Sequence, residues 1–239
     1  MASLYLIPVT LGDTPIEQVL PAYNHDVIVS IRHFIVEEVR TARRFLKQVD
    51  KSIDIDQLSF YPMGKHADKA LFSQYLEPLR KGENIGIISE AGCPAIADPG
   101  ADVVAIAQSE GMKVVPLVGP SSILMALMAS GFNGQNFAFH GYLPINSHDR
   151  INALKRMETT SASAHQTQLF IETPYRNHQM IDNIISACHA DTRLCIAAGI
   201  TCGDNEYIRT MTIKQWRTKL KQIPDLKKIP AIFLICAGR

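Results

Sequence analysis

Short apolar runs alternate with stretches of helical periodicity along most of the chain. The runs are continuous rather than alternating, which is typical of strands covered on both faces. They predict strands at residues 4–9, 27–31, 85–89, 114–118, 137–141, 169–172, 194–200 and 231–236. Apolar positions three and four apart predict helices at residues 36–49, 69–81, 101–111, 121–131, 150–157, 176–189 and 212–222. This alternation predicts an α/β fold with largely parallel sheets.

The longest apolar stretch, residues 114–132, also indicates where the chain divides. It is long enough to raise the question of a membrane span. Gly119 and Pro120 interrupt it, however, so a strand, a turn and a helix that starts near a proline explain it better. The turn leaves two halves that each have their own strands. We therefore expect α/β domains at residues 1–118 and 119–239, and a cleft between two such units is a usual place for a ligand.

Composition narrows the class of protein without naming a function. The 239 residues are 46% hydrophobic and 20% charged, which excludes disordered, collagen-like and coiled-coil chains. Lysine and arginine number 24 against 23 acidic residues, so binding to nucleic acid or membranes would need local charge clusters. The five cysteines are widely spaced and form no CxxC pair, which favours reduced thiols over disulfides or a zinc site. The N-terminal segment is a poor signal peptide, and we expect a cytoplasmic protein without a bound metal.

Several strong catalytic signatures are absent from the sequence. It contains no GxGxxG, GxxxxGK[ST], GxSxG or HExxH motif. Their absence argues against the common dinucleotide-binding fold, P-loop ATPases, α/β-hydrolases and zinc proteases of the HExxH type.

The most informative segment is residues 87–100, where an apolar strand ends in small residues, proline and glycine before a helix begins. Ligands of open α/β sheets bind at such carboxyl ends of strands, and small residues allow the backbone to approach them closely. The carboxylate of Glu90 could accept hydrogen bonds from ligand amino or hydroxyl groups. An ordinary tight turn between a strand and a helix, whose residues cap the helix, explains the pattern equally well. Residues 119–124 and 170–176 are likewise either ligand-binding or ordinary helix starts.

Two basic clusters stand out against the neutral whole. Arg40, Arg43, Arg44 and Lys47 are spaced to share one helix face, which could hold phosphates or could simply be a solvated surface. A second cluster lies near the C-terminus, and alone it is typical of a solubilising surface. It comprises Lys214, Arg217, Lys219, Lys221, Lys227 and Lys228.

These segments, in this order, resemble the tetrapyrrole methylase superfamily of S-adenosylmethionine-dependent methyltransferases. Within it they are most similar to the small-subunit ribosomal RNA methyltransferase I family, which methylates the ribose 2′-OH of a cytidine in small-subunit (16S) rRNA. The similarity runs from residues 4–8 to residues 232–235. Its most specific parts are residues 89–94, 97–100, 115–122, 141–144 and 172–176, with residues 36–40 where the family has Ala-Glu-Asp-Thr-Arg.

The resemblance implies two α/β domains with the cofactor in the cleft between them, a homodimer, and an rRNA or ribosomal-subunit partner. The cofactor it implies is S-adenosylmethionine, held in a folded shape largely by backbone groups. Carried over by position, the cofactor-binding residues are Pro8, Glu90, Ala91, Gly92, Cys93, Pro94, Ile96, Ala97, Ser121, Ser122, Leu143, Pro144, Phe170, Ile200, Pro230 and Ala231.

Methyl transfer from a sulfonium is an in-line displacement that depends mostly on positioning, and a ribose hydroxyl benefits from a general base. By its place in the motif, Glu37 is the candidate base or orienting residue, and Arg40 is the candidate contact for a substrate phosphate.

The chain departs from the family pattern at three places that bear on its function. Residues 9–13 alter a loop on the substrate side, and Glu90 replaces the usual Asp while keeping the carboxylate. Residues 198–202, Ala-Gly-Ile-Thr-Cys, replace an Arg-Glu-Leu-Thr-Lys run and so lose three charged residues. Two alternatives therefore stay open: an enzyme of the same fold with another RNA or small-molecule substrate, or a cofactor-binding protein without catalytic activity.

Overall fold

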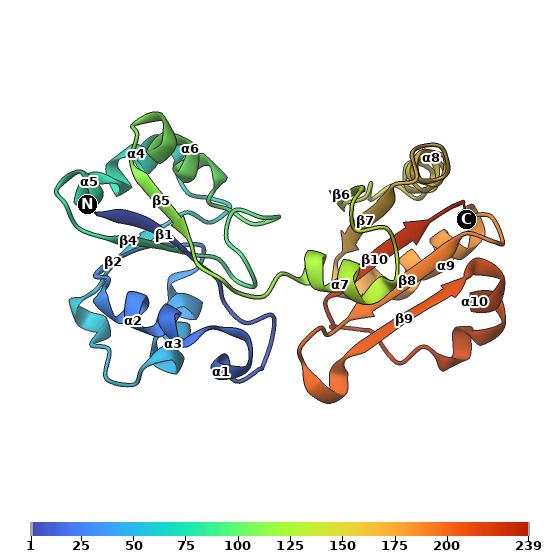
Figure 1. Cartoon of the computed structure of the whole chain (residues 1–239), viewed down its shortest axis with the longest axis horizontal. Coiled ribbons are helices and arrows are strands. Elements are labelled where there is room, and N and C mark those ends of the chain that lie inside the picture. Colours follow the sequence, from blue (N-terminus) through green and yellow to red (C-terminus); the bar gives the residue numbers. More distant parts are fainter. Residues whose placement is uncertain (1, 239) are drawn as a thin grey trace. The chain divides into compact units, whose positions relative to one another are not determined.

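The computed structural model describes residues 2–238, and the chain forms two compact units, Met1–Ser121 and Ser122–Arg239. Each unit consists of a five-stranded sheet with helices packed against it (Figure 1). The division falls between Ser121 and Ser122, whereas the sequence places it between residues 118 and 119. Among the described residues, no helix combines the length and the apolar character that crossing a bilayer requires.

The first unit contains an entirely parallel sheet. Its strands, in spatial order, are β3 (Ser59–Pro62), β2 (His33–Val36), β4 (Ile85–Ile88), β1 (Ser3–Ile7) and β5 (Lys113–Pro116). One face packs against α2 (Ala22–Ser30) and α3 (Val39–Val49), and α1 (Ile16–Val19) adjoins the same cluster. The other face packs against α4 (Phe72–Tyr75), α5 (Glu77–Arg80) and α6 (Ala101–Ser109). Because all five strands are parallel, their carboxyl ends meet at one edge of the sheet.

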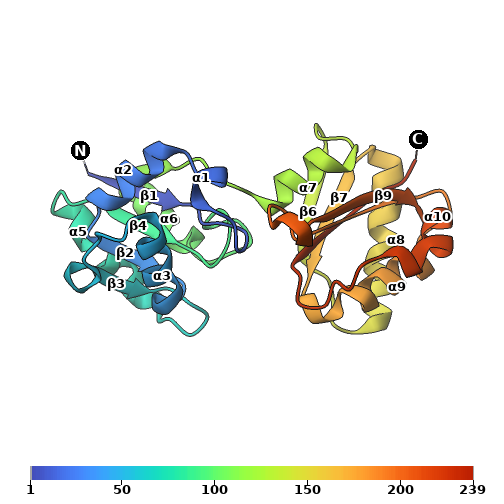
Figure 2. The same cartoon turned by 90° about the horizontal axis from the view of Figure 1, so that it is seen from below.

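The second unit contains a mixed sheet. Its strands, in spatial order, are β6 (Phe137–Tyr142), β7 (Thr167–Glu172), β10 (Ala231–Cys236), β8 (Arg193–Ala198) and β9 (Tyr207–Thr212). Only the β6–β7 pair is parallel. Its helices are α7 (Ser122–Ser130), α8 (Ser147–Ala164), α9 (Asn177–Ala187) and α10 (Ile213–Lys219), and Figure 2 shows them around the sheet. Short 3-10 turns complete the two units at Ile55–Gln57, Lys69–Leu71, Pro174–Arg176, Gly203–Asn205 and Leu220–Gln222.

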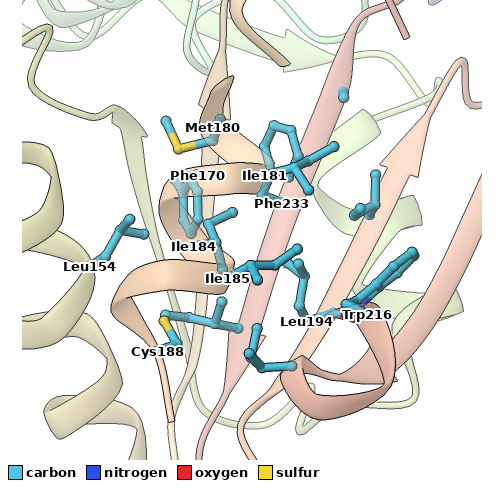
Figure 3. Packing of buried hydrophobic residues seen from close by; sticks show 14 of the residues in the cluster. Leu154, Phe170, Met180, Ile181, Ile184, Ile185, Cys188, Leu194, Trp216 and Phe233 are labelled. Atoms are coloured by element: carbon cyan, nitrogen blue, oxygen red, sulfur yellow. Dashed lines mark hydrogen bonds between the residues drawn. The ribbon is translucent and has the colours of Figure 1, made fainter. Parts of the chain in front are cut away.

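The core of the second unit forms where α8, α9 and α10 meet one face of its sheet (Figure 3). Phe170 on β7 stacks on Phe233 on β10, with ring centroids 5.8 Å apart. Trp216 is fully buried, and its Nε1 donates a hydrogen bond to the carbonyl oxygen of Leu194 at 3.0 Å. This bond satisfies the polar group that burial of an indole would otherwise leave without a partner.

The structure corrects several predictions about the first unit. Residues 27–31, predicted as a strand, lie mostly in α2, and the strand is instead β2, part of which had been assigned to a helix. Periodicity alone cannot separate a short buried helix segment from a strand. Strand β3 was missed, and the helix predicted over 69–81 is divided into short turns around Leu76 and Pro78.

In the second unit, the prediction of largely parallel strands is wrong. Strand β9, which lies at an edge of the sheet, was missed. Helix α8 extends beyond its predicted range at both ends. Asn146 caps its start by accepting hydrogen bonds from the backbone of His148 and Asp149, and the left-handed His165 follows its last residue.

Candidate active site

The carboxyl edge of the parallel sheet brings together three of the predicted site residues of the first unit. Pro8 follows β1, Glu37 follows β2, and Glu90 lies just beyond β4, which is hydrogen-bonded to both other strands. The Glu37 amide donates to the Ile88 carbonyl oxygen at 3.1 Å, extending the ladder beyond the strands. The Glu37 carboxylate in turn accepts a hydrogen bond from the Glu90 amide at 3.2 Å. Glu37 is therefore fixed beside the start of the loop formed by residues 89–100.

Helix α3 holds the Glu90 carboxylate at this edge through Thr41. The Thr41 hydroxyl lies within hydrogen-bonding distance of Glu90 Oε1 and of the Glu38 carbonyl oxygen. Beside them is a small cavity of about 120 Å³, whose lining includes Val9, Thr10, Thr41, Arg44, Ser89 and Glu90. The cavity thus lies between the ends of β1 and β4 and one side of α3.

Three carboxylates around this edge act on one another. Burial raises the pKa of Glu37 above that of an ordinary carboxyl, and the negative charge of Asp98 adds to the shift. Burial also raises the pKa of Asp98, with a further contribution from Glu90, although the nearby Ser89 hydroxyl acts in the opposite direction. Glu37 is therefore a better proton acceptor than a solvated glutamate.

The loop of residues 89–100 has an unusual backbone. Ala95 and Ala97 adopt left-handed conformations with φ of 67° and 63°, although neither is glycine. Such residues cost about 1–3 kcal/mol each and cluster at ligand-binding and catalytic sites. Two bonds hold the loop: the amide of Val9 donates to Gly92 at 2.9 Å, and the amide of Ala95 donates to Pro99 at 3.1 Å. Ala91, Pro94 and Ile96 belong to the same loop, and the Ile96 side chain is 54% exposed.

The turn that follows β5 closes against this loop. A Cβ at Gly119 would lie 2.3 Å from Pro8 Cγ, so only glycine fits between the two segments. The Cys93 thiol donates to the carbonyl oxygen of Pro120 at 3.4 Å, and burial raises the pKa of this thiol. Cys93 is therefore a packing residue and not an activated nucleophile. Ser121 and Ser122, both half-buried, follow this turn.

In the second unit, most of the predicted residues also gather at one sheet edge. Strand register places Ala231 opposite both Glu172 and Ala198, and the Gly199 amide donates to the Pro230 carbonyl oxygen at 3.0 Å. Ile200 lies just after β8, and Leu143 and Pro144 just after β6. Phe170 differs, since its side chain is fully buried in the core against Phe233. Its place is beneath this edge and not on its surface.

A buried carboxylate and a buried arginine hold the turns at the same edge. The Glu172 side chain, only 2% exposed, accepts a bond from Arg176 at 2.6 Å and another from the Thr173 amide at 2.6 Å. The buried Arg150 donates to the carbonyl oxygens of Pro144 and Ile145 at 3.2 and 2.8 Å. The turn after β6, which carries Leu143 and Pro144, and the turn after β7 are thus held by charged hydrogen bonds, which are stronger than neutral ones.

The basic face of α3 is less uniform than its spacing suggests. Arg40, the candidate phosphate contact, is exposed in the first turn of the helix. Arg44 lines the cavity near Glu90, whereas Arg43 lies over the ring of Phe60, 5.3 Å from its centroid. Lys47 donates to the carbonyl oxygen of Lys51 at 2.9 Å. Arg40 and Arg44 are therefore the cations of this helix best placed for a substrate.

The site contains two residues that the sequence reasoning did not single out. Asp98 lies in the segment of residues 87–100, and a carboxylate in that segment was the feature that could have identified it. Thr41 gave no signal, because its contact with Glu90 arises only when α3 packs beside the loop. In the described part of the chain, no group of three or more His, Cys, Asp or Glu side chains is arranged to hold a metal ion.

Comparisons with known proteins place the chain in a family. No family model matches it. It is 26% identical over 97% of its length to ribosomal RNA small subunit methyltransferase I of Vibrio cholerae, covering 76% of that protein. The corresponding protein of Streptococcus pyogenes serotype M6 is 30% identical over 87% of the chain, which covers 68% of it. The curated relatives are covered over 48% to 76% of their lengths.

A solved structure supports the same assignment at the level of fold. The methyltransferase CobJ, a tetrapyrrole methylase, superposes with a TM-score of 0.63 at 11% identity, covering 99% of this chain and 95% of its own. The predicted fold class and the predicted resemblance are thereby confirmed. The chain belongs to the ribosomal RNA small subunit methyltransferase I family, a family of S-adenosylmethionine-dependent methyltransferases with the tetrapyrrole methylase fold.

Proposed function

We propose that this protein transfers a methyl group from S-adenosylmethionine to a ribose 2′-OH of small-subunit rRNA. The observation that carries the proposal is Glu37, a carboxylate of raised pKa anchored at the end of β2 beside the loop of residues 89–100. A ribose hydroxyl is a weak nucleophile, and a positioned base of this kind accelerates its reaction.

The charge of the site fits the proposed cofactor. S-adenosylmethionine supplies a methyl group on a positively charged sulfur and also carries an ammonium group. Glu37, Glu90 and Asp98 form a cluster of negative charge, and none of them has an ion pair with a cation among the described side chains. Burial is the main cause of the raised pKa values of Glu37 and Asp98, and a cationic ligand would relieve the charge repulsion that adds to it. The left-handed loop and the closely packed Gly92 present backbone groups for the rest of the molecule.

In the proposed reaction, Glu37 accepts the proton of the ribose hydroxyl as the oxygen–methyl bond forms and the sulfur–methyl bond breaks. Breaking this bond leaves a neutral thioether, so the positive charge that favoured binding disappears with the transfer. Arg40, exposed on the first turn of α3, contacts a phosphate of the RNA backbone and holds the ribose in line.

A second candidate is a methyltransferase of the same fold with a different substrate. The segment of residues 198–202 favours it, because it carries no charged side chain, and Thr201 adopts a left-handed φ of 70° there. A nearby side chain holds this segment in place: the Thr201 amide donates a hydrogen bond to Glu206 Oε2 at 2.8 Å.

The experiment that separates the two candidates is transfer of labelled methyl from S-adenosylmethionine to small ribosomal subunits from cells lacking this gene and its relatives. We expect label in the rRNA. A known family member labels the same subunits as the positive control. If only the control labels them, the substrate is not small-subunit rRNA.

Replacing Glu37 with Gln tests the proposed base. The amide keeps the shape but cannot accept the proton, so the rate of methyl transfer should fall about 10²- to 10⁴-fold. Affinity for S-adenosylmethionine, measured by calorimetric titration, should change little. Glu38→Gln is the matched control, since Glu38 is exposed and caps α3 through the Arg40 amide. Unchanged turnover in Glu37→Gln would remove Glu37 from the mechanism.

A further inference from the structure

The C-terminal part of the second unit differs in charge from the remainder of the chain. Residues 207–238 contain seven lysines and arginines but a single carboxylate, Asp225. All other residues together contain seventeen lysines and arginines against twenty-two carboxylates. A cluster of cations alone is typical of a solubilising surface, but here carboxylates are almost absent, so the cations create a positive field that attracts polyanions. The segment is therefore a strongly basic region on a nearly neutral protein.

Helix α10 exposes part of this positive charge to solvent. Ile213 and Trp216 are fully buried against the sheet, which leaves Lys214 exposed on the opposite side of the helix. Lys219, half-buried, ends the helix, and the exposed Lys221 lies in the turn that follows. Because Trp216 is tied to the Leu194 carbonyl oxygen, the orientation of the helix is fixed. The charge therefore lies on a rigid element.

Figures 1 and 2 show the loop that joins α10 to β10. Its sequence adds two more lysines. Asn177, fully buried at the start of α9, donates from Nδ2 to the carbonyl oxygens of Leu226 and Ile229 at 3.1 and 2.8 Å. These bonds bracket Lys227 and Lys228, both of which are exposed. The loop leads directly into Ala231, which lies at the sheet edge that carries the predicted site residues of this unit.

Most lysines and arginines of the described residues, those of this segment included, form no ion pair, although Lys227 lies close enough to Asp225 for their charges to interact. Lys69 pairs with Asp102 at 2.7 Å, and Arg80 pairs with Glu77 and Glu110 at 2.8 and 2.6 Å. Among the described residues, no ion pair involves Lys214, Lys219, Lys221, Lys227 or Lys228. Arg217 has a structural role instead, since it donates to the Ile185 carbonyl oxygen at 3.2 Å near the C-terminus of α9.

We propose that Lys214, Lys219, Lys221, Lys227 and Lys228 form a second RNA-binding surface, which contacts backbone phosphates. The proposal rests on rRNA being the substrate and extends it, because this surface is distinct from the arginines of α3. Lysine is a point charge on a flexible stem and contacts phosphates without reading base edges. The surface therefore supplies affinity that depends on salt but not on sequence.

An anionic membrane is the other polyanion that such lysines could meet, and the structure favours RNA. A helix that lies in a bilayer interface needs an exposed apolar face. On α10 the apolar residues Ile213 and Trp216 are buried, and the following Leu220 is only 38% exposed. The basic surface consequently has charge but little apolar area to insert into lipid.

The test is equilibrium binding of a fluorescein-labelled fragment of small-subunit rRNA, measured by anisotropy from about 50 to about 200 mM KCl. Lys227→Gln/Lys228→Gln should weaken binding and reduce the slope of log K against log salt by about 1.4–1.8, or about 0.7–0.9 per lost contact. Changing all five lysines should reduce the slope further. Lys155→Gln/Arg156→Gln, two exposed cations on α8, is the matched control and should leave the slope unchanged.

Each outcome separates this inference from the proposed function. Thermal unfolding and S-adenosylmethionine affinity of the variants first establish that they fold. If the wild type methylates rRNA but the lysine variants bind it with unchanged affinity and slope, the surface is wrong and the proposed function stands. If RNA binding depends on the lysines but no methyl reaches rRNA, the surface stands and the proposed function fails. Lysine-dependent binding to phosphatidylglycerol vesicles without RNA binding would overturn the surface as an RNA site.

Discussion

Asp98 illustrates how single residues set the chemistry of this site. Its carboxylate is half-buried and lies close enough to Glu37 and Glu90 for their charges to interact. A cationic ligand would relieve this charge repulsion. The site therefore favours binding of the sulfonium S-adenosylmethionine over binding of the neutral thioether product. The same repulsion raises the proton affinity of Glu37, so Asp98 acts through Glu37 as a positioning residue.

Replacing Asp98 with Asn should therefore shift the pH dependence of methyl transfer. The acid limb, where Glu37 becomes protonated, should move to lower pH, because removing a negative charge lowers the pKa of Glu37. The measurement is the rate of methyl transfer as a function of pH. Asp102→Asn, at an exposed aspartate paired with Lys69, is the control and should leave the limb in place. An acid limb that does not move in Asp98→Asn would mean that the two carboxylates are not coupled.

The stability of the same variant should depend on pH in a definite direction. The pKa of Asp98 is raised in the folded protein, so its favourable contribution is complete below its unfolded pKa and is lost as the pH rises through the folded one. The neutral amide avoids that loss, so Asp98→Asn should raise the melting temperature at pH 7 more than at pH 4, as followed by circular dichroism. An equal change at both values would contradict the assigned shift.

At the scale of elements, close contact between loops defines the site of the first unit. The loop of residues 89–100 could be recognised from the sequence because small residues, proline and glycine follow an apolar strand. Its contact with α3 could not, since it depends on how the helix packs beside the sheet. Likewise, α2 resembles a strand in sequence because Val27 and Ile28 are buried on a short helix. Strand ends were therefore more predictable than the segments that pack around them.

Gly119→Ala tests the close contact between the turn after β5 and the end of β1. The added Cβ would lie 2.3 Å from Pro8 Cγ, and the proline ring cannot rotate away. We expect a loss of about 1–3 kcal/mol in the free energy of unfolding by urea, together with weaker S-adenosylmethionine binding. Gly134→Ala, where a Cβ meets nothing within 4 Å, is the matched control. Equal stability of the two variants would contradict the close contact, because it would mean that the turn can move to accommodate a Cβ at residue 119.

At the scale of the whole molecule, each unit has a sheet enclosed by helices, and this enclosure explains the main error in the predicted fold. Strands covered on both faces are apolar throughout, whether their neighbours run parallel or antiparallel. Strands β7, β8 and β10 are almost entirely buried, so their sequences carry no sign of direction. The fold class could thus be predicted from the sequence, whereas the strand directions of the second sheet could not.

The most direct test of the central claim is the chemical position of the transferred methyl group. Small-subunit rRNA labelled by the wild-type protein is hydrolysed in alkali, which cleaves the chain wherever a 2′-OH is free. We predict that the label remains in alkali-resistant dinucleotides, because methylation of the ribose oxygen removes the nucleophile for cleavage, and that Glu37→Gln yields almost none. Label recovered in ordinary mononucleotides would place the methyl group on a base and contradict ribose methylation.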